Sequence, residues 1–218
     1  MPRLIAIGDI HGCSAALRAI LEAIELGDDD HVVTLGDYVD RGPDSRGVID
    51  QLLELDASGR LTSLLGNHEE MMLGALRGSY PRTWWFQHGG VATLDSYGFV
   101  GDLSVIPQQH LDFIDRCLPY YETDDFIFTH ANYVADEPMD RQPAEALRWQ
   151  SLQEHTPKEH FSGKRVIVGH TAQKRGEVQD LGYLVCLDTY CHGGGWLTAR
   201  DVETGQTWQV SADGALRV

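Results

Sequence analysis

The chain has 218 residues, of which 42% are apolar and 23% charged, and its formal net charge is −16. This length is ample for one buried core, and we expect a single domain over residues 1–218. The acidic balance argues against a nucleic-acid partner, which needs clustered lysine and arginine. No apolar stretch approaches the roughly 20 residues that span a bilayer, so we expect no membrane partner.

Cysteine usage predicts neither a zinc ribbon nor a thioredoxin-type site, because no Cys-x-x-Cys pair occurs among Cys13, Cys117, Cys186 and Cys191. We expect no signal peptide at Met1-Pro2-Arg3. We therefore expect reduced thiols in a cytoplasmic protein.

The first half of the chain alternates predicted strands with predicted helices. Short apolar runs predict buried strands over residues 4–7, 31–35 and 61–65. Apolar residues at helical spacing predict helices over residues 15–26, from Ser45 onward, and over 69–76, with Ser14 and Ser45 as N-caps. This alternation predicts parallel pairing and an α/β layer architecture.

The second half is richer in predicted strands. Residues 78–119 have mostly helical or loop patterns and contain the aromatic cluster Trp84-Trp85-Phe86, which we interpret as core, with a substrate-contacting wall as the alternative. Further strands are predicted over residues 126–128, 166–168 and 183–187. Residues 196–201 and 207–210 predict a terminal hairpin.

Metal-binding side chains recur where predicted strands end, usually directly after a glycine. They are Asp9 and His11, Asp37, Asn67, His130, and His170. Where the chain is still extended, alternate residues point the same way, so Asp9 and His11 can face one ion. A mixed oxygen and nitrogen set without thiolates suits Mn, Fe or Zn. Two such ions about 3.5–4 Å apart can clamp a phosphate and activate a bridging water.

Three further residues beside these ligands indicate chemistry. His68 directly follows Asn67, so it stands next to the site without binding metal. Asp40 can orient and charge that histidine, which makes it a general acid for a leaving alkoxide. Arg41 can grip phosphate oxygens bidentately. Each turn taken alone is more often structural, and only their succession favours the metal site.

These motifs, in this order, resemble the signature of the phosphoprotein phosphatase (PPP) family within the calcineurin-like metallophosphoesterases. The resemblance rests on Gly8-Asp9-x-His11-Gly12, Gly36-Asp37-x-x-Asp40-Arg41-Gly42 and Gly66-Asn67-His68-Glu69, followed by Thr129-His130-Ala131 and Gly169-His170-Thr171. The length and the context of residues 67–72 are most similar to the bacterial and phage branch, which includes the bacteriophage lambda phosphatase. The resemblance spans roughly residues 4–190.

The resemblance implies a mixed α/β fold with a central β-sandwich flanked by α-helices. It implies two divalent ions, with Mn²⁺ preferred and Fe or Zn tolerated, of which Asp9 and His11 hold the first and Asp37 bridges both. The second ion would be held by Asn67, His130 and His170. His68 would donate the proton, paired with Asp40, while Arg41 and Asn67 bind the phosphate. The implied reaction is direct attack by a metal-bridging hydroxide on phosphorus, without a phosphoenzyme.

Two segments depart from the family pattern. The phage branch has a second phosphate-binding arginine two residues after a tryptophan, and alignment on Trp149 puts Ser151 there. Arg148, before the tryptophan, could substitute from a shifted backbone, or it is a surface arginine. The segment Asp188 to Gly193 contains His192, a conceivable extra ligand for which we favour a loop role.

The leading functional hypothesis is a phosphomonoesterase that acts on phosphoserine and phosphothreonine in phosphoproteins or phosphopeptides. A symmetrical bis(5'-nucleosyl)-tetraphosphatase is the alternative, and Asp40 argues against it because such relatives usually lack this aspartate. A non-catalytic metal-binding or phosphopeptide-binding module predicts an incomplete ligand set. All six ligands and His68 are present here, so this third reading is disfavoured.

Overall fold

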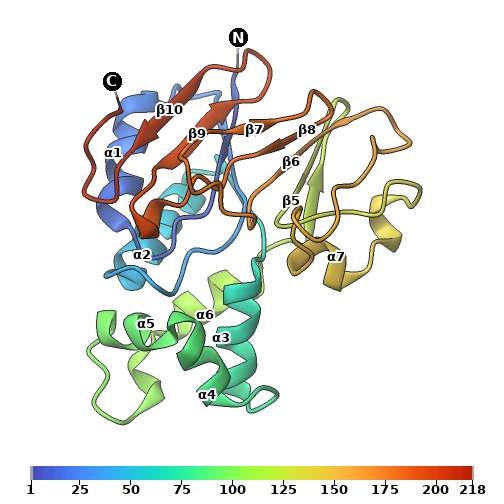
Figure 1. Ribbon diagram of the computed structural model, residues 1–218. Coiled ribbons are helices and arrows are strands. Elements are labelled where there is room, and N and C mark those ends of the chain that lie inside the picture. The colour runs from blue at the N-terminus through green and yellow to red at the C-terminus, as the bar shows by residue number, and fades with distance from the viewer. Residues whose placement is uncertain (1, 218) are drawn as a thin grey trace.

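The computed structural model describes residues 2–217, which form two five-stranded mixed sheets (Figure 1). The first has the order β10-β9-β1-β2-β3 and contains β1 (Leu4–Ile7), β2 (His31–Thr34), β3 (Leu61–Ser63), β9 (Leu197–Asp201) and β10 (Thr207–Val210). The second has the order β4-β5-β6-β8-β7 and contains β4 (Tyr120–Glu122), β5 (Phe126–Thr129), β6 (Arg165–Val168), β7 (Gln179–Asp180) and β8 (Leu184–Cys186).

The two sheets pack face to face because their strands alternate between two apolar faces. In β1, Ile5 and Ile7 belong to the core under the helices, whereas Ala6 belongs to a core shared by both sheets. In β6, Ile167 faces the shared core, while the residues on either side of it face a third core cluster. Period-two alternation with both faces apolar produces the predicted central sandwich, which is confirmed.

Helices α1 (Ser14–Ile24) and α2 (Ser45–Ala57) cover the outer face of the first sheet and bury residues at helical spacing. The predicted N-caps are wrong by one residue at both helices, since Ser14 and Ser45 lie inside the first turn. Asp44 caps α2 by accepting a hydrogen bond from the Gly47 amide at 2.9 Å. Ser14 instead donates to Asp44 at 2.6 Å, so one carboxylate joins the starts of both helices.

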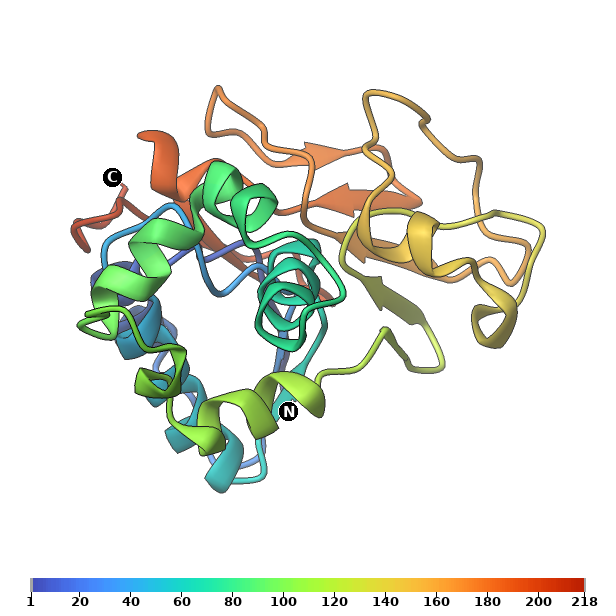
Figure 2. The same ribbon diagram turned by 90° about the horizontal axis from the view of Figure 1, so that it is seen from below.

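The segment between the two sheets is helical, as the sequence predicts. It contains α3 (Asn67–Arg77), α4 (Arg82–Trp85), a π-helical turn (Phe86–Gly90), α5 (Val91–Ser96) and α6 (Gln108–Asp115). Figure 1 shows these helices gathered below the sheets, and Figure 2 shows them beside α7 (Ala144–Arg148) and the second sheet. The buried side chain of Trp85 confirms a core role for part of the aromatic cluster.

Parallel pairing sets where the loops emerge. Strands β1, β2 and β3 are parallel to one another, and so are β5, β6 and β8. Each group therefore has its carboxyl ends at one edge of its sheet. The terminal hairpin β9–β10 is antiparallel and confirmed. The short edge strands β4 and β7 were not predicted, because three and two residues are too few to establish a pattern.

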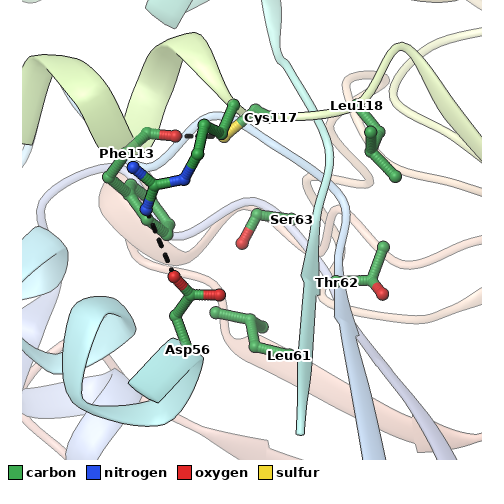
Figure 3. A pocket seen from close by; sticks show the side chains of 8 residues that line it. Asp56, Leu61, Thr62, Ser63, Phe113, Cys117 and Leu118 are labelled. Carbon is green, nitrogen blue, oxygen red and sulfur yellow. Dashed lines mark hydrogen bonds and ion pairs between the residues drawn. The ribbon is translucent and has the colours of Figure 1, made fainter. Parts of the chain in front are cut away.

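One cavity of about 240 Å³ lies between α2, β3 and α6, away from the predicted ligands (Figure 3). Its lining includes Asp56, whose carboxylate accepts a hydrogen bond from Arg116 at 3.3 Å. None of the site residues predicted from the sequence lines it. Within residues 2–217, no helix combines the length and the apolarity needed to cross a bilayer.

Candidate metal centre

Every predicted metal ligand follows a parallel strand, either in the loop after it or, for Asn67, at the start of the next helix. Asp9 and His11 follow β1, Asp37 follows β2, Asn67 follows β3, and the two remaining histidines, His130 and His170, follow β5 and β6. All are buried except His170, which is partly buried. The sandwich thus brings the loops of both sheets to one place.

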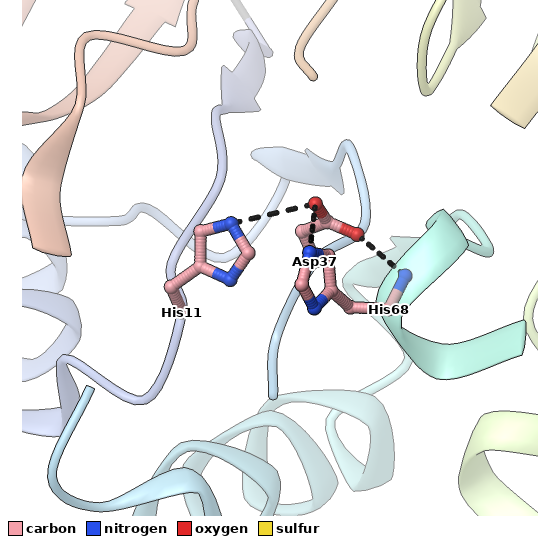
Figure 4. Close-up of side chains that lie close together, drawn as sticks. All are labelled: His11, Asp37 and His68. Atoms are coloured by element: carbon pink, nitrogen blue, oxygen red, sulfur yellow. Dashed lines mark hydrogen bonds and ion pairs between the residues drawn. The ribbon is translucent and has the colours of Figure 1, made fainter. Parts of the chain in front are cut away.

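Asp37 lies at the middle of this cluster, between groups from both sheets. Its Oδ2 atom is 3.4 Å from Nε2 of His11, and its Oδ1 atom is 3.4 Å from Nε2 of His130. Oδ1 also accepts a hydrogen bond from the His68 amide at 3.1 Å, which aligns the start of α3 with the carboxylate (Figure 4). A carboxylate with one oxygen toward each histidine has the placement required of a bridging ligand.

Backbone carbonyls determine which nitrogen each imidazole presents to the centre. Nδ1 of His11 donates to Val39 at 2.9 Å, and Nδ1 of His130 donates to Leu35 at 2.7 Å. Nε2 of His170 likewise donates to Trp149 at 3.0 Å. A carbonyl can only accept, so the opposite nitrogen of each neutral ring keeps its lone pair.

The pKa values agree with neutral rings. Burial lowers the pKa of His11 well below its ordinary value and also lowers that of His130. Burial and the neighbouring His130 lower the pKa of His170 to about 4. These imidazoles are therefore unprotonated at neutral pH, the form in which they bind metals.

This donor set fits divalent cations because lone-pair acceptors on neighbouring side chains face one another without a proton between them. The Oδ1 atom of Asn67 lies 3.1 Å from both Nε2 of His130 and Nδ1 of His170. With the tautomers above, neither nitrogen carries a proton to place in between. Two triads, His11–Asp37–His68 and Asp37–His130–His170, have ligand atoms within 4.8 Å of one another. Converging lone pairs of this kind are stabilised by a cation.

Asp9 belongs to neither triad of the described chain. Both of its oxygens lie 3.0 Å from the backbone amide of His170, which ties the first sheet to the second. Burial and the nearby carboxylates of Asp188 and Asp37 raise the pKa of Asp9 well above its usual range. Buried carboxylates gathered in this way are costly unless a cation compensates them.

The backbone of the centre is strained. Among residues 2–217, the non-glycine residues with left-handed φ are Glu25 and a group at or beside the centre: His11, Asp37, Asp40, Arg41, His170 and Tyr190. Such conformations concentrate at functional sites. The predicted extended alternation of Asp9 and His11 is wrong, because His11 has φ of 45° and lies in a turn.

The glycines before the ligands allow the loops to approach closely. A Cβ atom on Gly66 would lie 2.3 Å from Oδ1 of Asp37, and one on Gly169 would lie 2.1 Å from Oδ1 of Asp9. Neither carboxylate could keep its place beside a larger residue. The recurring glycine in the sequence is thus explained by contact between neighbouring loops as well as by turn geometry.

His68 is held by a buried carboxylate that it does not share with the metal ligands. Its Nδ1 atom donates to Asp40 at 2.7 Å. Asp40 is fully buried and also accepts from Trp85 at 2.9 Å and from Thr93 at 2.7 Å. Burial alone would lower the pKa of His68, but the Asp37 charge and the Asp40 hydrogen bond outweigh it and raise the pKa.

The other nitrogen of His68 points at the centre. Its Nε2 atom is 4.0 Å from Oδ2 of Asp37 and, within residues 2–217, is buried without a hydrogen-bond partner (Figure 4). Buried polar atoms are normally paired, so an unpaired one at a site indicates a missing partner.

The two predicted phosphate-binding arginines have different surroundings. Arg41 extends from the Asp40 turn, is exposed, and places Nη1 3.0 Å from Nε2 of His11, so it reaches the centre. Arg148 ends α7 and pairs with Glu70, at the edge of the cluster. Ser151, aligned with the family's arginine, instead accepts a hydrogen bond from the Gln153 amide at 3.1 Å.

The sequence assigned no role to Asp188 and Thr93, and for His192 it favoured a loop role over that of an extra ligand. Asp188 follows β8 and has its pKa raised to about 6, mainly by burial. It repeats the pattern of a polar residue after a strand. His192 places its ring 4.5 Å from that of His11, and its Nδ1 atom is buried and unpaired within residues 2–217. No sequence signal indicates the contact of Thr93 with Asp40.

The sequence profile described as calcineurin-like phosphoesterase matches residues 2–199. The chain belongs to this family. Membership of the calcineurin-like metallophosphoesterases is therefore confirmed, as is the fold, while the narrower phosphoprotein phosphatase family and its bacterial and phage branch stay predictions.

The relatives of this calcineurin-like phosphoesterase include a protein phosphatase and dinucleoside tetraphosphatases. The serine/threonine-protein phosphatase 1 of Salmonella typhimurium is 41% identical over 85 residues, which cover 38% of this chain and 37% of that protein. The symmetrical bis(5'-nucleosyl)-tetraphosphatase of Legionella pneumophila is 43% identical over 77 residues, which cover 35% of this chain and 27% of that protein. The alignments thus span well under half the length of these relatives.

Several solved structures resemble this chain over nearly its whole length. One of them is a crystal structure provisionally described as a diadenosine tetraphosphatase, with a TM-score of 0.72 and 26% identity. The match covers 96% of this chain and 95% of that chain.

Proposed function

We propose that the protein is a metal-dependent phosphomonoesterase of the bacterial and phage branch that hydrolyses phosphoserine and phosphothreonine in proteins. The observation that carries this proposal is the pair of His68 and Asp40. It presents an unpaired ring nitrogen to the centre while the carboxylate behind it is held by Trp85 and Thr93. An oriented acid is needed for alkyl phosphates, because serine and threonine alkoxides are poor leaving groups.

In this proposal two ions would be held at the centre, and Asp37 would contribute to both sites. Asp9 and His11 complete the first site, and Asn67, His130 and His170 complete the second. Such a pair, when bound, would neutralise the phosphate and supply an activated water. Mn²⁺ is the proposed metal, and the donor set also tolerates Fe or Zn.

The chain's own groups then orient the phosphate and handle the leaving group. Arg41 binds phosphate oxygens with its exposed guanidinium, assisted by the amide of Asn67. Arg148 is proposed as the second phosphate-binding arginine, which would require it to exchange Glu70 for the phosphate. His68 delivers its Nε2 proton to the departing serine or threonine oxygen and becomes a neutral ring, while Asp40 orients the ring and stabilises its protonated form before the transfer.

A symmetrical dinucleoside tetraphosphatase is the second candidate, supported by the Legionella relative and by the similar crystal structure. Its leaving group is a nucleoside diphosphate, which departs with much less need of an acid than an alkoxide. The hydrogen bonds that hold His68 and Asp40 in place therefore favour the phosphoprotein reaction, in which an acid is needed.

A side-by-side assay decides between the candidates. Phosphothreonine peptides, an aryl phosphate and diadenosine tetraphosphate are compared by kcat/KM with Mn²⁺, Fe²⁺ and Zn²⁺ in turn. We expect turnover of the peptides and the aryl phosphate. Hydrolysis of the dinucleotide alone would overturn the proposal and establish the second candidate.

A further inference from the structure

A cavity of about 420 Å³ adjoins the candidate centre between α3, α4 and α7. We call it the indole cavity, and its walls include Glu70, Tyr80, Trp84, Glu145, Arg148 and Trp149. It is contiguous with the centre at two points. Glu70 lies one helical turn after Asn67, and the carbonyl of Trp149 accepts the hydrogen bond from His170 at 3.0 Å.

Aromatic rings form a rigid wall of this cavity. The rings of Trp84 and Trp149 stack with centroids 5.6 Å apart and an interplanar angle of 18°. Tyr80 meets Trp84 edge to face at 5.1 Å and donates its hydroxyl to Glu70 at 2.9 Å. The two indoles are both partly buried, so each keeps accessible surface. Because they stack on each other, a flat ligand cannot be inserted between them.

The charged groups of the indole cavity favour a cation. The guanidinium of Arg148 is already paired with Glu70. Glu145 is exposed, and within residues 2–217 its carboxylate has neither an ion pair nor a hydrogen bond. An unpaired carboxylate beside indole faces is the chemistry that recognises guanidinium or ammonium groups. The net charge of −16 reinforces this preference and disfavours a polyanionic dinucleotide.

We propose that the indole cavity binds an arginine or lysine side chain of the substrate polypeptide, close to the phosphorylated residue. This inference rests on the proposed phosphoprotein phosphatase function and adds a substrate class, phosphopeptides with a basic neighbour. Glu145 supplies the opposite charge, and Trp84 and Trp149 supply the aromatic faces. The phosphate and the basic side chain are then bound by adjacent surfaces.

The test compares matched phosphothreonine peptides with the Mn²⁺-loaded enzyme. One arginine is placed in turn at each of three positions on either side of the phosphothreonine, and citrulline replaces it in the neutral control. We expect the best arginine peptide to have a KM about 10-fold below its citrulline partner, the size expected for an aromatic face plus one exposed carboxylate. Glu145→Gln and Trp84→Leu should each bring the arginine-to-citrulline ratio of kcat/KM toward one.

The matched control is Glu203→Gln, which removes the same charge from the exposed β9–β10 turn and should keep the ratio. Equal KM values for both peptides in the wild type, an unchanged ratio in Glu145→Gln, or an equal loss in Glu203→Gln would each overturn the inference. So would a rise in KM for diadenosine tetraphosphate alone in Trp84→Leu, which would identify a nucleobase site. Failure of every peptide while the dinucleotide is hydrolysed would instead refute the proposed function.

Discussion

At the scale of single residues, two neighbouring positions at the start of α3 have different proposed roles, one as a metal ligand and one as the acid. Asn67 turns its amide oxygen toward His130 and His170, whereas His68 turns toward Asp37 and Asp40. Glu69, the next residue, accepts hydrogen bonds from the amides of Asp37 at 2.8 Å and Tyr38 at 2.7 Å. Three successive residues at one helix start thus hold the Asp37 loop, a proposed metal ligand and the proposed acid in a single geometry.

His68→Asn should keep the fold and the metal but lose the proposed acid. Turnover of a phosphopeptide should fall by about 10²–10⁴-fold, with a smaller loss on an aryl phosphate whose leaving group needs little protonation. Metal content is measured on the same samples. The exposed His155→Asn serves as the control and should retain turnover. Unchanged phosphopeptide turnover in His68→Asn would remove this residue from the mechanism.

Asp37→Asn should weaken both ions, because it removes the one charge that faces ligands of both triads. We expect the affinity for metal to fall at least about 10-fold. Removing only the hydrogen-bond partners of metal ligands already lowers metal affinity by about 10–100-fold, so loss of a ligand itself should cost no less. Metal stoichiometry after dialysis measures the effect. Asp95→Asn, on the exposed side of α5, is the control. Two full equivalents of metal in Asp37→Asn would contradict the bridging assignment.

At the scale of elements, a polar cluster joins α1 to the starts of β1 and β2. Arg3 donates to Asp30 through its amide at 2.8 Å and through Nε at 2.9 Å. The same guanidinium satisfies the carbonyl of Ile24 at 3.1 Å and that of Glu25 at 2.9 Å, at the end of α1. Carbonyls at a helix end lack partners within the helix, so this arginine completes its C-terminus.

Asp30→Asn should therefore lower the free energy of unfolding, by about 1–2 kcal/mol at pH 6. The Arg3 hydrogen bond lowers the pKa of Asp30 from its ordinary value to about 2. A lowered carboxylate pKa means that its stabilisation is present above about pH 4 and is lost as the pH falls toward 2. Urea unfolding at pH 6, 5, 4 and 3 should show the difference from wild type shrinking. The exposed Asp29→Asn should show no such trend; a difference that is constant with pH would contradict the charge-based explanation.

At the scale of the whole molecule, the two ends of the described chain complete one sheet. Strand β1 pairs with β2 on one side and with β9 on the other, so residues near positions 5 and 201 are neighbours. The core between the sheets then joins Ala6 and Val33 to Phe128 and Val185. We propose on this basis that residues 1–218 form a single domain.

Unfolding should accordingly be one cooperative transition. Tryptophan fluorescence, helical circular dichroism and calorimetry should give coincident transitions, and the calorimetric and van't Hoff enthalpies should agree. The measurement is made on the metal-loaded and on the metal-depleted protein, since bound ions raise the stability of the native state by mass action. Two separated transitions in the loaded protein would contradict a single domain.

Much of the candidate site could be predicted from the sequence because its residues directly follow strands. Asp37 and His170 are placed by the strand that precedes each of them. Parallel pairing then brings the carboxyl ends of neighbouring strands to one edge of each sheet. Asp188 was given no role, although it follows β8 as the predicted ligands follow their strands. The caps of α1 and α2 escaped prediction because Asp44, rather than the serine after it, caps α2, and the fold brings Ser14 of α1 against that same carboxylate.

By itself, the sequence determined the order of the main strands and helices, the proposed metal-binding side chains and the residues adjacent to them, since these follow from local periodicity and spacing. Only the tertiary structure decided which distant groups meet. Thr93 reaches Asp40 across 53 positions, and Arg148 reaches Glu70 across 78. Such contacts depend on how whole loops and helices pack, and no local pattern encodes them. The hydrogen bonds that support the proposed acid and the walls of the indole cavity are both decided by the tertiary structure.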